Sequence, residues 1–124
     1  MSFNFNLKID RDFIISMYEE DYPYISEVFS TTLGQLIPDI EILKKAFANR
    51  DLESLRKQVH KIKPAFGFAG LRDTEALCQQ FEDNCLSVSS TEILADKYGT
   101  LIISLEASCV IIQQEIEKLK VYKN

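Results

Sequence analysis

Apolar residues recur at every third or fourth position along most of the chain, which is the spacing of helices that bury one face. The pattern predicts a short helix over 10–20, followed by four long amphipathic helices over 21–48, 51–69, 72–86 and 90–121. Alternation typical of a strand is confined to Phe3, Phe5, Leu7 and Ile9. We therefore expect an all-α fold in one domain over 1–124. It would be an antiparallel up-down four-helix bundle with a short additional N-terminal helix, after an extended leader over 1–9.

Polar residues and glycine mark where these helices begin and end. The predicted N-cap of the helix over 10–20 is Asp10, that of the helix over 21–48 is Asp21 or Tyr22, and that of the helix over 51–69 is Asp51. Ser89 and Glu92 have the spacing of a capping box for the last helix. Gly70 is expected to end the helix over 51–69 by adopting a left-handed conformation, with Leu71 folding back toward Phe66. The apolar stripe of the first helix is expected to contain Phe13, Ile14 and Met17.

Two prolines interrupt predicted helices, at positions 38 and 64. An interior proline removes one backbone hydrogen bond and clashes with the preceding turn. Pro38 therefore predicts a kink or break near Ile37, and Pro64 predicts a bend in the helix that follows.

Composition and charge exclude several classes of function. The formal net charge of -5 argues against nucleic-acid binding, which requires a basic surface to displace counterions. No run of eighteen apolar residues and no signal-like start occur, so we expect a cytoplasmic protein without a membrane span. The three cysteines, Cys78, Cys85 and Cys109, form no CxxC pair and are expected to be reduced core residues. With a single histidine, they do not suggest a metal site.

The single histidine, His60, lies about 130° from the core stripe of its helix and should face water. The residues one and two turns away on the same face are Glu53, Arg56, Lys57, Lys63, Pro64 and Gly67. A mid-helix glycine costs about 1 kcal/mol and a proline about 3 kcal/mol. Their position on this face suggests a surface kept clear so that a partner can approach the ring. Phe68, about 80° from His60, is also off the core stripe.

This combination of residues suits phosphoryl transfer. Nearby cations disfavour the imidazolium form and leave a neutral imidazole nucleophile. An ammonium one turn away, such as Lys63, can hold phosphoryl oxygens. General acid–base catalysis is less well supported, because no carboxylate lies one turn from His60 to orient the ring. An exposed helical histidine is most often a solvated surface residue, so an unrelated bundle with an incidental histidine is an alternative.

The stretch His60-Lys61-Ile62-Lys63-Pro64-Ala65, followed by Gly67, Gly70 and Leu71, resembles the histidine-containing phosphotransfer (HPt) domain family of two-component signalling. The family pattern is a histidine, any residue, an aliphatic residue, lysine, two small residues, and a glycine about ten positions after the histidine. Looser agreement extends over 21–82. The departure is Pro64, where the family more often has glycine or serine.

The resemblance implies a four-helix bundle in which His60 is the phosphorylated residue and Lys63 helps to hold the phosphoryl group. Gly70 would serve the turn after the helix. The residues expected to contact a docked partner are Arg56, Lys57, Pro64, Gly67 and Phe68. No cofactor or metal site is expected in the chain itself, since Mg²⁺ would be supplied by the receiver domain.

Two functions follow from this resemblance. The first is a free-standing, monomeric phosphotransfer protein without autonomous kinase activity, which relays a phosphoryl group between aspartates of receiver domains. Its partners would be response regulator receiver domains and a hybrid sensor histidine kinase. The alternative is a non-phosphorylated adaptor that docks receiver domains as a scaffold or inhibitor. The presence of both His60 and Lys63 favours the relay, because a scaffold needs neither.

Overall fold

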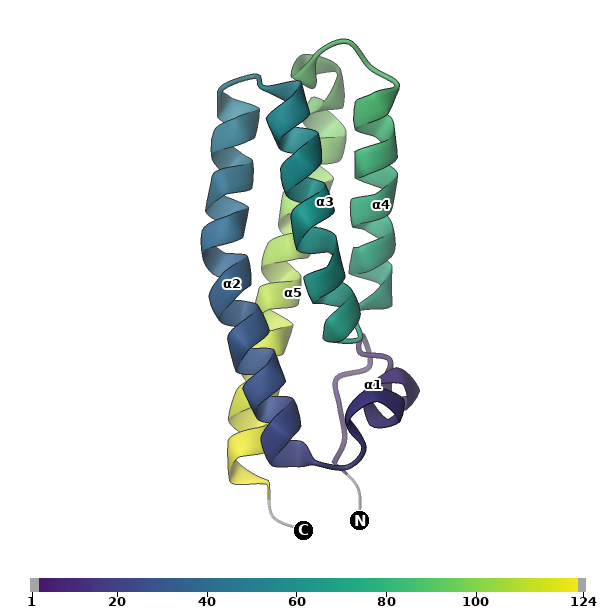
Figure 1. The fold of residues 1–124 in the computed structure, drawn as a ribbon, viewed down its shortest axis with the longest axis vertical. Coiled ribbons are helices and arrows are strands. Elements are labelled where there is room, and N and C mark those ends of the chain that lie inside the picture. The colour runs from purple at the N-terminus through teal and green to yellow at the C-terminus, as the bar shows by residue number, and fades with distance from the viewer. Residues whose placement is uncertain (1–2, 123–124) are drawn as a thin grey trace.

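The computed structural model describes residues 3–122, which form an all-helical bundle (Figure 1). Its elements are α1 (Arg11–Tyr18), α2 (Tyr22–Ala48), α3 (Leu52–Phe68), α4 (Arg72–Leu86), the 3₁₀ turn η1 (Thr91–Leu94) and α5 (Ala95–Val121). Helices α2, α3, α4 and α5 run alongside one another with alternating direction, and α1 lies near the end that carries the termini. The predicted four-helix bundle with a short N-terminal helix is confirmed.

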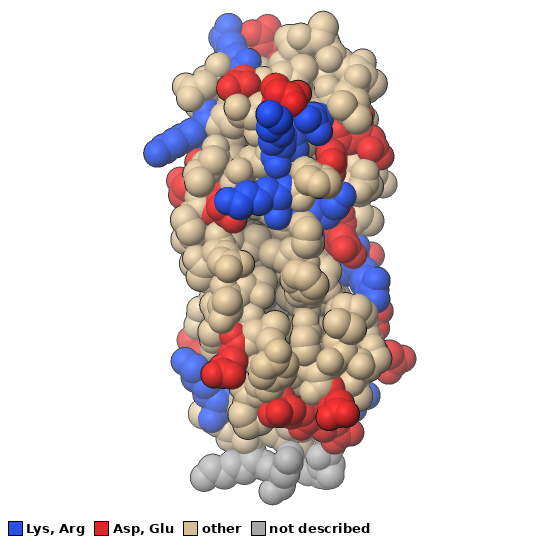
Figure 2. Space-filling view, in the orientation of Figure 1, with Lys and Arg blue, Asp and Glu red and all other residues tan. Residues whose placement is uncertain are grey.

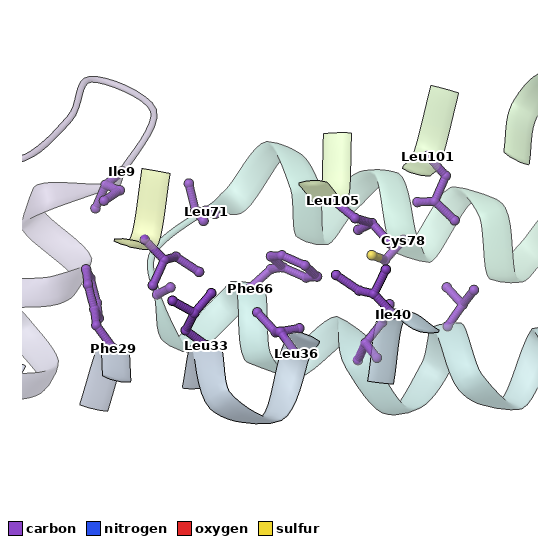
Figure 3. Packing of buried hydrophobic residues seen from close by; sticks show 14 of the residues in the cluster. Ile9, Phe29, Leu33, Leu36, Ile40, Phe66, Leu71, Cys78, Leu101 and Leu105 are labelled. Carbon is purple, nitrogen blue, oxygen red and sulfur yellow. The ribbon is translucent and has the colours of Figure 1, made fainter. Parts of the chain in front are cut away.

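One face of each bundle helix forms a continuous apolar core. Phe66, Leu36, Ile40 and Leu105 come from three helices and point toward one another in the interior (Figure 3). Each of these side chains is 4% exposed or less, and burying one of this size contributes about 1.5–3 kcal/mol. Helix α3 packs against both α2 and α4, so its outward face lies between these two neighbours.

Three aspartates begin helices as predicted. Asp10, Asp21 and Asp51 accept hydrogen bonds from the backbone N–H groups of Phe13, Tyr24 and Ser54, each at 3.1 Å. A cap of this kind contributes about 1 kcal/mol. The charged side chains thereby fix where α1, α2 and α3 start.

The capping box predicted at Ser89 and Glu92 is wrong. Ser90 is the N-cap of η1 without a side-chain hydrogen bond, and α5 begins only at Ala95. Glu92 instead forms an ion pair with Arg50 at 3.0 Å. Both Thr91 and Leu94 are buried, which the tighter 3₁₀ turn allows because it places residues three apart on one side.

Neither interior proline breaks its helix. Helix α2 is continuous through Pro38, and α3 is continuous through Pro64. Figure 1 shows α2 changing direction part-way along its length, as expected of a helix that lacks one hydrogen bond and must avoid the proline ring.

The turn after α3 has the predicted geometry. Gly70 has φ of 73°, and its N–H donates to the carbonyl of Gly67 at 3.0 Å. Leu71 donates to the carbonyl of Phe66 at 2.9 Å. These two bonds define a Schellman motif, and the positive φ explains why glycine occupies this position.

The N-terminal residues depart from the predicted pattern in two places. Phe3, Phe5 and Ile9 are buried, but Leu7 is fully exposed because the chain turns there, with the Ile9 N–H donating to Asn6 at 2.9 Å. A simple extended leader is therefore wrong for its second half. Met17 was expected in the core stripe of α1 but is exposed, since α1 is short and only Ile14 is buried. Residues 1 and 2 of the predicted leader lie outside the described part.

The segment Thr91–Val121, which covers η1 and α5, is the one stretch within residues 3–122 that could span a membrane by length and composition. A core helix of a bundle passes the same criterion. Helix α5 buries Leu101, Leu105 and Ile112 in the apolar core. Packing within the bundle accounts for only part of its apolar character, because the stretch that meets the criterion is 33% buried and both Ile103 and Val110 are exposed.

Candidate functional site

His60 lies in the middle of α3 on its outward face. The neighbouring Val59 and Ile62 are buried, whereas the His60 side chain is 64% exposed. The helical spacing placed the ring correctly, because the direction of a side chain on a regular helix follows from its position in the sequence. The imidazole is therefore accessible to a partner from solution.

A carboxylate from the next helix contacts the ring. Oε1 of Glu82, on α4, lies 2.7 Å from Nδ1 of His60. The prediction that no carboxylate orients the imidazole is wrong, because it considered only residues of the same helix. The sequence did hold a signal for this contact. Glu82 is next to the buried Phe81 and one turn from the buried Cys78 and Cys85, and this spacing places an acid on the face of α4 that packs in the bundle.

Glu82 is held in its ionised form by its neighbours. Its side chain is only 11% exposed, and this burial acts to raise the pKa of the carboxyl. The hydrogen bonds from Lys63 and from His60 act in the opposite direction and prevail, so the pKa of Glu82 lies below its ordinary value. An ionised carboxylate only accepts hydrogen bonds. Nδ1 of His60 is consequently the donor, which leaves the lone pair of the neutral ring on Nε2.

Lys63 lies on the same side of α3 and is paired in this structure. Its Nζ is 3.1 Å from Oε2 of Glu82 and 2.6 Å from Oε1 of Gln79. The amide of Gln79 in turn donates to Asp83 at 2.9 Å. Glu82 thus links the histidine and the lysine, one through each oxygen. The ammonium lies one helical turn from the ring, where it can reach a group attached to Nε2.

The two other cations predicted for docking, Arg56 and Lys57, form a basic cluster around His60 together with Lys61, which was not predicted. Figure 2 shows Lys and Arg side chains gathered on the upper half of the face formed by α2 and α3. Arg56 and Lys57 contact Glu53 at 2.6 and 3.8 Å, and Lys61 contacts Asp39 at 3.3 Å. Exposed pairs of this kind contribute little to stability, so these cations can exchange partners at small cost.

The remaining predicted docking residues differ in their surroundings. Phe68 is 52% exposed and Pro64 is exposed, as their positions on the helix indicated. Gly67 is half-buried, and a Cβ at this position would collide with the carboxylate of Glu75 on α4. Glycine at 67 therefore permits the side chain of Glu75 to lie against α3.

The cysteines have no role at this site. Cys78 and Cys85 are buried, Cys109 is half-buried, and all three are free thiols. Burial raises the pKa of Cys78 to about 12 and those of Cys85 and Cys109 to about 11. They are therefore protonated near neutral pH and unreactive. Within residues 3–122, no group of three or more metal-ligating side chains is present.

Comparison with known proteins agrees with this architecture. Residues 27–120 match the family model of the Hpt domain, and the chain therefore belongs to the Hpt domain family. Its fold is similar to that of the HPT domain from the Hpt sensor hybrid histidine kinase of Shewanella, with a TM-score of 0.76 and 19% sequence identity. That alignment covers 90% of this chain and 95% of the other. Among curated proteins, none matches this sequence.

Proposed function

We propose that the protein relays a phosphoryl group between aspartates of receiver domains through phosphorylated His60, without autonomous kinase activity. Membership in the Hpt domain family supports a role in two-component phosphorelay. The observation that carries the finer assignment is the contact between Nδ1 of His60 and Glu82 at 2.7 Å on an otherwise exposed ring. A cytoplasmic location and action as a monomer belong to the same proposal.

The contact with Glu82 supports a separate role for each ring nitrogen in the proposed transfer. Nε2 of His60 attacks the phosphorus of an aspartyl phosphate, a P–N bond forms, and the P–O bond to the aspartate breaks to release its carboxylate. The proton on Nδ1 stays on the ring, hydrogen-bonded to Glu82, which stabilises the positive charge that develops on the imidazole. Transfer to the next receiver reverses these steps, so no proton has to be exchanged with solvent.

Lys63 would stabilise the transferred group. Its Nζ is held by Glu82 and Gln79 at hydrogen-bonding distance. A phosphoryl group on Nε2 brings anionic oxygens within one turn of this ammonium, and a charge-assisted bond to phosphate can replace the one to Gln79. Mg²⁺ would be provided by the receiver domain, whose own acidic residues face the basic cluster of Arg56, Lys57 and Lys61.

The relay and the adaptor alternative are separated by direct labelling. The protein is incubated with a receiver domain charged beforehand with acetyl phosphate, and in parallel with phosphoramidate, a small donor that needs no docking. Alkali-stable, acid-labile phosphate is expected on the wild type from both donors and on neither with His60→Gln. A wild type that binds the charged receiver but takes no phosphate from it would instead establish the adaptor. Label retained in His60→Gln would contradict the assignment of the site.

A further inference from the structure

The packing of α4 against α5 leaves two pockets along one seam of the bundle. The first has a volume of about 220 Å³ and is lined by residues within 77–84 on α4 and 96–101 on α5. The second has a volume of about 260 Å³ and is lined by residues within 71–77 and 104–111, together with Lys8. Because Leu77 lines both pockets, they follow one another along the seam.

Both pockets have apolar side chains in their linings, and we name each after one of them. Phe81 and Leu101 line the first, the Phe81 pocket, and Leu71 and Ile111 line the second, the Ile111 pocket. The centres of the two linings are about seven residues apart on α4 and about nine on α5, which corresponds to roughly 10–14 Å along the helices. The seam therefore offers two places for apolar side chains, about two helical turns apart.

Beside this seam, the outward side of α5 carries an apolar stripe. Ile103 and Val110 are 71% and 55% exposed, and Ala107 between them is exposed as well. Together with Gly99 they lie within about 80° on the helix. Ile103 and Val110 are seven residues apart, so their side chains project from one side of α5 about 10 Å from each other. This stripe explains why the apolar stretch of α5 is only 33% buried.

The spacing of Ile103 and Val110 matches the spacing of the two pockets. A two-fold axis perpendicular to the helices would place α5 of a second copy antiparallel to α5 of the first, and every contact would then occur twice. Ile103 of one copy would enter the Ile111 pocket of the other, while Val110 would enter the Phe81 pocket. Both contacts require the same register of the two helices to within about 3 Å.

The charges around the seam do not oppose the approach of an identical surface. Each pocket has one acid and one cation in its lining, Asp96 with Lys97 in the first and Asp73 with Lys8 in the second. Glu106 borders the apolar stripe, but its carboxylate is held toward α2 by Lys44 at 3.2 Å. The local balance of charge thus allows self-association although the chain carries a formal net charge of -5.

We propose that the chain forms a reversible dimer through this seam, with Ile103 and Val110 of each copy inserted into the pockets of the other. Within residues 3–122, the linings of the two pockets do not include His60 or Glu82. In Figure 1, α3 lies in front of α5, so the outward faces of these two helices point to opposite sides of the bundle. Both histidines stay accessible in the dimer, and each chain still acts as a monomer in the proposed transfer.

The size of the contact sets the expected strength of the dimer. The seam extends over about 24 Å of α5 and across the width of two helices, so each copy would bury on the order of 500 Å². This is less than the roughly 800 Å² per partner of a standard stable interface. We therefore expect a weak dimer, with a dissociation constant on the order of 10–100 μM.

Sedimentation velocity of the full chain, at concentrations below and above this constant, tests the proposal. Ile103→Glu and Val110→Glu each place a charge in a pocket of the second copy, and both residues are exposed in the single chain, so its fold should tolerate them. Ile42→Glu is the matched control, because Ile42 on α2 is 49% exposed and lies outside both linings. Circular dichroism and thermal unfolding check that all variants are folded.

We expect the wild type to show a monomer–dimer equilibrium. Ile103→Glu and Val110→Glu should each raise the dissociation constant at least about tenfold, because an apolar contact is lost and an unpaired charge is buried. Ile42→Glu should sediment like the wild type.

Three results would overturn the proposal. The first is a wild type that stays monomeric well above the expected constant, which would leave the pockets to a different partner. The second is a dimer that forms equally well in Ile103→Glu and Val110→Glu, and the third is equal weakening by Ile42→Glu. The measurement uses no phosphate, so a wild type that takes no label would contradict the proposed relay without affecting this test.

Discussion

The two sides of α3 differ in how they surround His60. Toward α4, the histidine meets a connected polar group in which Glu82 contacts both the ring and Lys63. Toward α2, the adjacent Lys61 lines a groove whose walls contain both interior prolines and Gly34 as well as polar side chains. In the proposed relay, the first side would act on the protonation and charge of the His60 ring, whereas the second would offer a shaped surface to a partner. Chemistry and recognition can therefore vary independently on one helix.

Substitutions on the α4 side should have the larger effect on labelling by phosphoramidate, a donor that does not need to dock. Glu82→Ala removes the acceptor that fixes the proton on Nδ1 and leaves Lys63 without its carboxylate. Labelling by phosphoramidate should fall on the order of 10²-fold. The matched control is Glu75→Gln, which alters an acid of α4 that lies over Gly67 rather than against the ring. Equal rates of phosphoramidate labelling for Glu82→Ala and the wild type would contradict the proposal that the α4 side controls the chemistry of the ring.

Lys63→Ala should have the next largest effect. Loss of one charge-assisted hydrogen bond to the phosphoryl oxygens corresponds to about 1.5–3 kcal/mol, or roughly 10–100-fold in rate. The comparison variant is Lys61→Ala, which removes a cation two residues earlier that faces α2 through Asp39. We expect Lys63→Ala to slow both donors and Lys61→Ala to slow only the receiver. The opposite assignment in quenched-flow measurements would exchange the roles of the two lysines.

The α4 side should also leave a signature in the pH dependence of stability. The pKa of Glu82 is depressed in the folded state. The ionised carboxylate therefore makes its full contribution to the free energy of unfolding above the pKa of the unfolded state, near 4.5. This contribution is lost as the pH falls through the pKa of the folded state. Glu82→Gln should therefore be less stable than the wild type at pH 7, by about 2 kcal/mol. The difference in urea unfolding should shrink below pH 4.5, and a difference that grows in acid would contradict the sign.

Features set by local spacing could be predicted from the sequence. The exposure of His60, the aspartate caps and the turn at Gly70 each depend on residues within about one or two helical turns. Glu82 was missed because it is separated from His60 by 22 residues and comes from another helix. The start of α5 was misplaced because burial of Thr91 and Leu94 outweighed a capping pattern.

The prolines illustrate the same limit on the α2 side. In the sequence, Pro38 and Pro64 are two separate interruptions of two helices. Only the packing of α2 against α3 shows that both line one groove. A pattern within one helix reveals the direction of a side chain but not which residues of another helix it meets. Sites built between helices therefore escape a reading based on periodicity, even when the helices themselves are correctly predicted.

The smallest predicted effect concerns the cost of the groove. Pro64→Ala restores the N–H that can donate to the carbonyl of His60, and should stabilise the fold by about 1 kcal/mol, less than the full 3 kcal/mol because the helix has already adapted to the ring. The same variant should weaken transfer from receivers while leaving phosphoramidate labelling within about twofold. Thermal unfolding and the two labelling rates check both parts. If Pro64→Ala were less stable than the wild type, the proline would stabilise the fold. The claim that the α2 side of α3 lowers stability for the sake of its shape would then be wrong.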